Sequence, residues 1–147
     1  MLRISIGNKL VCATLCFYIL SCGQSSTDRS HSNKYTQYFR QGEQLYERHC
    51  SNCHQPSGKG LGRVYPPLHQ SDFMKENFSE VICLMKYGID GELIVNGVAY
   101  NQAMPGIPSL TDLEVAQIAT YIYNSWTHTE GLVDVKDVSR ILNECNP

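Results

Sequence analysis

Cys50-Ser51-Asn52-Cys53-His54 is the stretch of this 147-residue chain that says most about its fold. In a helical turn, residues three and four positions apart lie on one face, so Cys50, Cys53 and His54 point the same way. Two thiols at this spacing can add to the two vinyl groups on one edge of a porphyrin, and the imidazole can then reach the iron. The motif therefore predicts one covalently bound haem c, with His54 as an iron ligand.

Two other kinds of site also use a C-x-x-C pair. A structural zinc site usually brings a second Cys or His pair at matching spacing, and the sequence contains no second C-x-x-C and no H-x-x-x-H. A thioredoxin-like redox pair would lie in a βαβ context, and no such alternation surrounds the motif. The sequence thus favours haem over both alternatives.

The first 21 residues are predicted to be an export signal. Arg3 and Lys9 give the segment a positively charged start, and residues 10–20 form an uncharged apolar run. A membrane-spanning helix needs about 20 apolar residues, so this run is too short to be one. The run ends at Ile19-Leu20-Ser21-Cys22, which resembles a bacterial lipoprotein cleavage box and implies lipid attachment at Cys22. The alternative is ordinary secretion, with Cys22 incidental.

Residues 22–34 are polar and lack apolar periodicity, which predicts a disordered tether. Residues 35–147 are then long enough for one domain with one core. Without Arg3 and Lys9, ten basic and fourteen acidic residues remain, a net charge of −4. The chain has no basic run, so its charge disfavours nucleic acid as a partner.

The cysteines outside the motif suggest one disulfide. Cys12 and Cys16 would leave with the signal peptide, which leaves Cys83 and Cys145 without a role. Disulfides persist in the compartments to which exported proteins go, so a Cys83–Cys145 bond is our hypothesis. The alternative is two unpaired cysteines that pack as small hydrophobic residues.

Helical patterns dominate the domain, and helices are expected over residues 35–50, 77–87, 113–126 and 134–145. Asn77 with Glu80, and Thr111 with Glu114, have the spacing of capping boxes. Gly42 lies inside the first helix, where a glycine is usually accepted because another helix approaches closely. Residues 93–100 predict a small hairpin with Asn-Gly as its turn.

Three further features concern the haem or its surroundings. Met104 lies in a loop stiffened by proline, from which its thioether could take the second axial site; the alternative is a methionine that packs on the core. The Pro66-Pro67 segment offers a carbonyl to the other ring nitrogen of His54; the alternative is a plain loop. His128 follows the third expected helix in a Thr-rich turn and is expected to be solvated.

The order of these motifs makes the chain similar to the class I monohaem cytochrome c domains, particularly small exported bacterial ones. The motifs are Gly42, Tyr46, Cys50-x-x-Cys53-His54, Pro66-Pro67-Leu68, Asn96-Gly97, Tyr100-Asn101-x-x-Met104-Pro105 and Tyr121-Ile122-x-Asn124-Ser125-Trp126. The resemblance covers roughly residues 36–126. It implies an all-α fold wrapped around one haem, with Met104 as the distal ligand. It also implies that Pro67 or its neighbour holds His54, and that the first helix crosses the helix near residues 118–122 at Gly42.

With both axial sites filled, iron has no open position for a substrate, so the resemblance implies a single-electron carrier and not an enzyme. Lipid at Cys22 would anchor the carrier to a membrane, facing the periplasm, near membrane-bound or soluble redox partners such as a respiratory reductase or oxidase. One alternative is a haem peroxidase or ligand-binding haem protein with a labile distal Met. Another is a sensor, or a dedicated subunit of a terminal reductase or oxidase complex.

Overall fold

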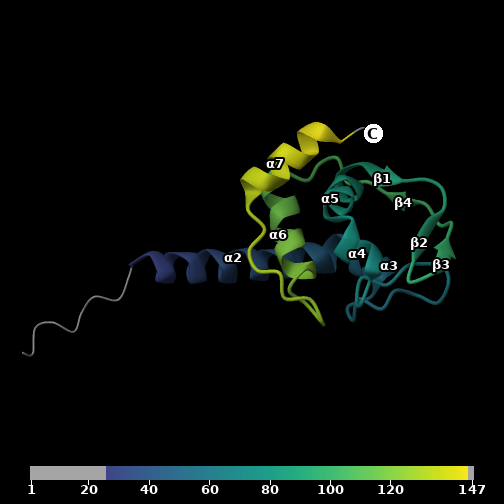
Figure 1. The fold of residues 1–147 in the computed structure, drawn as a ribbon, viewed down its shortest axis with the longest axis horizontal. Coiled ribbons are helices and arrows are strands. Elements are labelled where there is room, and N and C mark those ends of the chain that lie inside the picture. Colours follow the sequence, from purple (N-terminus) through teal and green to yellow (C-terminus); the bar gives the residue numbers. More distant parts are fainter. Residues whose placement is uncertain (1–25, 146–147) are drawn as a thin grey trace, which may run out of the picture. The chain divides into compact units, whose positions relative to one another are not determined.

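The structure is a computed structural model that describes residues 26–145, so the predicted signal peptide and Cys22 lie outside the described residues. The chain divides into two compact units, residues 1–31 and 32–147, and the packing described below is that of the second unit. The helices are α2 (Ser26–His49), α3 (Ser51–His54), α4 (Asp72–Glu76), α5 (Phe78–Tyr87), α6 (Asp112–Ile122) and α7 (Val135–Glu144) (Figure 1). The prediction of a mostly helical fold is confirmed.

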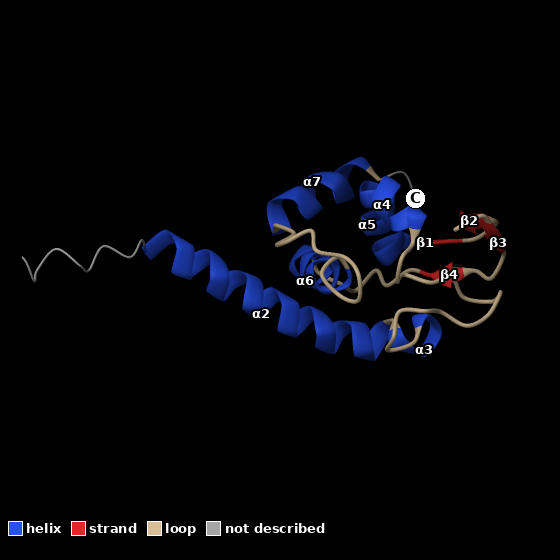
Figure 2. Cartoon of the chain, turned by 60° about the horizontal axis from the view of Figure 1, so that its bottom comes forward, coloured by secondary structure: helices blue, strands red, loops and turns tan. Residues whose placement is uncertain are grey.

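Four short strands complete the described part: β1 (Gly88–Ile89), β2 (Leu93–Val95), β3 (Val98–Tyr100) and β4 (Met104–Pro105) (Figure 2). Strands β2 and β3 form the predicted hairpin, in which Asn96 and Gly97 have φ of 51° and 71°. Two positive φ angles in a two-residue turn suit the twist of the flanking strands. Strand β1 pairs with β4, with Ile89 opposite Met104, a pairing that the sequence did not predict because each strand has only two residues.

Helix α2 begins earlier than the sequence predicted. Residues 26–34, expected to belong to a disordered tether over 22–34, are helical. They contain neither Pro nor Gly, and lengthening an existing helix needs no new nucleus. The start of the predicted tether lies outside the described residues.

The two capping boxes have opposite outcomes. Thr111 accepts from the Glu114 N–H while the Glu114 carboxylate accepts from the Thr111 N–H, so this box is confirmed. Asn77 precedes α5, but its side chain makes no capping hydrogen bond to this helix. Its side-chain Nδ2 donates instead to the Phe73 carbonyl, at 3.1 Å. The reason is α4, an unpredicted helix whose last turn runs directly into Asn77.

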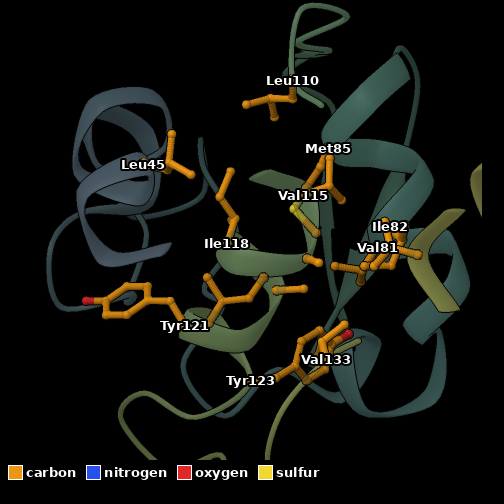
Figure 3. Packing of buried hydrophobic residues seen from close by; sticks show 14 of the residues in the cluster. Leu45, Val81, Ile82, Met85, Leu110, Val115, Ile118, Tyr121, Tyr123 and Val133 are labelled. Atoms are coloured by element: carbon orange, nitrogen blue, oxygen red, sulfur yellow. The ribbon is translucent and has the colours of Figure 1, made fainter. Parts of the chain in front are cut away.

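Helix α6 lies within the core, and each residue from Val115 to Ile122 is buried (Figure 3). It crosses α2 at Gly42, where an added Cβ would lie 1.9 Å from the Gln117 carbonyl oxygen and 2.9 Å from Tyr121 Cβ. The two backbones are therefore in direct contact. The crossing lies within one turn of the 118–122 stretch that the resemblance implied.

Helices α5 and α7 pack together, and a disulfide joins Cys83 of α5 to Cys145, which follows α7. The Cα atoms of this pair are 5.9 Å apart. Between residues 26 and 145, the free cysteines are the two of the C-x-x-C-H motif. Over the same residues, we find no helix with the length and apolar character needed to cross a bilayer.

Candidate haem site

The C-x-x-C-H motif consists of Cys50, which follows α2, and the single-turn helix α3. The amides of Cys53 and His54 both donate to the Cys50 carbonyl, at 3.2 and 3.0 Å. Burial, with a smaller effect from Cys53, raises the pKa of the Cys50 thiol to about 12. Redox-active C-x-x-C pairs depend on a lowered thiol pKa, so this environment disfavours a thioredoxin-like role.

His54 is buried, with 8% of its surface exposed, and its Nδ1 lies 3.0 Å from the Pro66 carbonyl oxygen. A carbonyl only accepts, so Nδ1 carries the hydrogen and Nε2 of the neutral ring has a free lone pair. Burial lowers the pKa of His54, against a smaller opposing effect of the Pro66 hydrogen bond. The side chain is therefore held as a neutral imidazole, the form that ligates a metal.

The carbonyl that holds His54 belongs to Pro66, the neighbour of Pro67, so the expected segment supplies the partner but Pro67 itself does not. Successive residues of an extended chain face opposite sides, so only one of two adjacent carbonyls can face the ring. The spacing of the sequence places both prolines near His54 but does not decide between them.

Residues 55–69, which we call the proximal loop, hold Pro66 through a set of backbone contacts. The Gly60 amide donates to the His54 carbonyl at 3.0 Å, and the buried Tyr46 hydroxyl donates to the Gln55 carbonyl at 2.6 Å. The Gly58 carbonyl accepts from Leu68 and His69, at 2.8 and 2.9 Å. The loop is thus folded back on the turn that carries His54.

Two adjoining cavities meet beside His54, and both are lined by His54, Pro66, Leu93 and Met104. The larger has an empty volume of about 580 Å³, which includes the open solvent at its mouth. Cys50 lines the larger cavity and Cys53 the smaller. The residues that line the two cavities come from α2, α3, α4, α5 and α6, from the four strands, and from the connecting loops.

The walls of the larger cavity fit a large apolar cofactor. Its remaining lining is mostly aliphatic and aromatic, including Val81, Met85, Val95, Ile118 and Ile122. Two free thiols, a neutral imidazole and a thioether therefore line these two adjoining cavities, and together they are the donor set of a covalent haem c. Within residues 26–145 no three His, Cys, Asp or Glu side chains form a metal-binding group, so nothing in this region favours zinc.

Sequence reasoning missed two features of the site. Met74 and Met85, whose sequence positions carry no haem-related signal, are buried and line the larger cavity. His128 was expected in solvent, but it is 5% exposed and its Nε2 lies 2.9 Å from the Leu68 carbonyl oxygen. No local signal could have found this contact, because it joins residues 60 positions apart.

Comparison with known proteins finds a match over residues 37–122 to the family described as "Cytochrome C oxidase, cbb3-type, subunit III". Cytochrome c-552 of Thermus thermophilus is 34% identical over 89 residues, which are 58% of this chain and 67% of that protein. The cytochrome c subunit of the quinone alcohol dehydrogenase of Gluconacetobacter polyoxogenes is 30% identical over 104 residues, 68% of this chain. The aligned part covers only 22% of that subunit. The family match includes the C-x-x-C-H turn and Met104.

Proposed function

The chain belongs to the family described as cytochrome c oxidase, cbb3-type, subunit III. We propose that it is a membrane-anchored single-electron carrier whose haem is ligated by His54 and Met104. Membership makes the chain a cytochrome c, an electron carrier with covalent haem c and not an enzyme. The ligands, the anchor and the partners are the parts that we propose.

The hydrogen bond from His54 Nδ1 to the Pro66 carbonyl is the observation that carries the proposed ligation. It leaves Nε2 as the free nitrogen of His54, on a cavity whose wall also includes Met104. When bound, the haem supplies the one-electron Fe(II)/Fe(III) couple. Cys50 and Cys53 would hold it through thioether bonds, and His54 Nε2 and the Met104 sulfur of β4 would be its iron ligands.

Optical spectra of three methionine variants test the distal ligand. Met104→Leu should convert a six-coordinate, low-spin haem into a five-coordinate or water-ligated one. Met74→Leu and Met85→Leu are matched controls, because each removes another thioether that lines the same cavity, and both should keep the parent spectrum. Core Met-to-Leu exchanges nearly conserve volume, so all three variants should fold.

The proposed ligation is wrong if the Met104→Leu spectrum matches that of the parent in both oxidation states. A change confined to one of the two control variants would move the assignment to that residue. The alternative of a peroxidase or ligand-binding haem protein needs an open distal position. Among the described residues, the walls of the two cavities contain no Arg and no second His, so nothing favours that alternative.

The proposed location is the periplasmic side of a membrane, with lipid on Cys22. Its support is the apolar run over residues 10–20 and the lipobox-like Ile19-Leu20-Ser21-Cys22, all outside the described residues. Cell fractionation tests it: the parent should remain with membranes, and Cys22→Ser should be released by washing. Equal retention of both forms would contradict lipid anchoring at Cys22.

The proposed partners are respiratory oxidases or dehydrogenases. The matched family is named for a subunit of an oxidase, and two relatives are cytochrome subunits of an alcohol and a fructose dehydrogenase. A lipid anchor would raise the effective concentration of the carrier beside such membrane complexes.

A further inference from the structure

The turn that follows α6 contacts the proximal loop at three points. This turn, residues 125–130, lies beside the loop in space although about 60 to 70 residues separate the two in sequence. At its start Trp126 has φ of +58°, a conformation that costs a non-glycine residue energy and needs support from its surroundings. The loop supplies part of that support, together with the rings of Tyr46 and Tyr121.

Trp126 makes the first two contacts. Its indole Nε1 donates to the Pro56 carbonyl at 3.3 Å. Its ring lies directly over Gly58, where an added Cβ would be 2.6 Å from Cζ2. The indole therefore occupies the space that a side chain at residue 58 would need, and it fixes the start of the loop against the end of α6.

His128 makes the third contact. Its Nε2 lies 2.9 Å from the Leu68 carbonyl, and because a carbonyl only accepts, Nε2 carries the hydrogen that it donates. The Leu68 amide in turn donates to the Gly58 carbonyl at 2.8 Å. Trp126 and His128 thus hold the two sides of one backbone contact, Gly58 with Leu68.

Leu68 lies two residues after Pro66, whose carbonyl orients His54. We propose that residues 125–130 brace the proximal loop, and that His128 is a positioning residue that fixes the Pro66 carbonyl against His54 and so tunes the reduction potential. This inference rests on the proposed role of His54 as an axial ligand. A hydrogen bond on Nδ1 makes Nε2 more basic, and a more basic ligand favours Fe(III) over Fe(II).

Three variants of the full chain test the brace. His128→Leu removes the donor, His128→Gln keeps a side-chain N–H, and Thr129→Val changes an exposed neighbour on the same turn. In His128→Leu, amide hydrogen exchange at Leu68 and His69 should quicken about tenfold, as expected for one lost hydrogen bond. The reduction potential should rise, because a looser Pro66 carbonyl weakens its bond to His54. His128→Gln should restore both values in part, and Thr129→Val should change neither.

The brace is wrong if His128→Leu leaves both the exchange rates and the potential at parent values. A faster exchange with an unchanged potential would overturn the tuning role alone. If His128→Leu does not fold, Trp126→Phe, which removes the bond to Pro56 and part of the ring over Gly58, should give changes in the same directions. The exchange rates report on the loop whether or not Met104 binds iron, so failure of the brace and failure of the proposed ligation are distinguishable.

Discussion

At the scale of single residues, one carbonyl decides which nitrogen of His54 is available. Burial keeps the ring neutral, and the Pro66 carbonyl assigns the hydrogen to Nδ1. Neither effect alone would prepare a metal ligand, because a neutral ring without a partner can carry its hydrogen on either nitrogen. The position of Pro66 therefore matters as much as the identity of His54.

Gly60 protects the position of that carbonyl, and a pair of glycines tests this role. An added Cβ at Gly60 would lie 2.2 Å from the Tyr65 carbonyl oxygen and 2.7 Å from that of Pro66, whereas nothing lies within 4 Å at Gly62. Both residues have positive φ, +66° and +55°, so Ala costs about 1–2 kcal/mol of backbone strain at either position. Only Gly60→Ala adds a clash, of about 1–3 kcal/mol.

Chemical denaturation and potentiometry of Gly60→Ala and Gly62→Ala separate the two costs. We expect Gly60→Ala to lower the free energy of unfolding by the larger amount and to change the reduction potential, whereas Gly62→Ala keeps the parent potential. Equal losses of stability with equal potentials would mean that the Pro66 carbonyl does not depend on Gly60.

Sequence reasoning identified the site features that depend on neighbouring residues. It missed those that depend on contacts between residues far apart in the chain. The C-x-x-C-H turn is local, so its chemistry is readable from five residues. The choice of Pro66 over Pro67, the burial of His128 and the cavity positions of Met74 and Met85 all depend on segments folded from elsewhere in the chain. Pattern alone carries no information about such contacts.

At the scale of elements, the same division holds. Amphipathic periodicity predicted α5, α6 and α7 to within a few residues, and Asn-Gly predicted the β2–β3 hairpin. The β1–β4 pair and α4 are too short for a periodic signal, yet β1–β4 places Met104 at the end of α5. The Ile107 amide, which donates to the Met85 carbonyl at 3.1 Å, continues that attachment.

The crossing of α2 and α6 allows an element-scale prediction. A Cβ at Gly42 would lie 1.9 Å from the Gln117 carbonyl oxygen, a backbone atom that cannot turn away, so Gly42→Ala must move one helix. The better helix propensity of Ala, about 1 kcal/mol, should be outweighed by a larger packing loss. Thermal unfolding should show a clear fall in Tm, whereas the exposed neighbour variant Gln41→Ala should not lower it. A Tm for Gly42→Ala at or above that of the parent would contradict the close crossing.

At the scale of the whole folded domain, the disulfide closes a long loop of the chain that includes part of the cavity wall. The Cys83–Cys145 bond spans 62 residues, and that span contains Met104 and all of α6 and α7. Cross-linking such a span restricts the unfolded chain and is expected to stabilise the domain by about 4 kcal/mol.

The double variant Cys83→Ser/Cys145→Ser should therefore unfold at a clearly lower guanidinium concentration than the parent. Each single variant, which leaves one free thiol, should resemble the double variant, because either change alone removes the bond. Mutation is preferable to a thiol reductant here, since a reductant would also reduce the haem iron. A thiol count on the unfolded, unreduced parent supplies the independent check: two free thiols, or a double variant as stable as the parent, would contradict the disulfide.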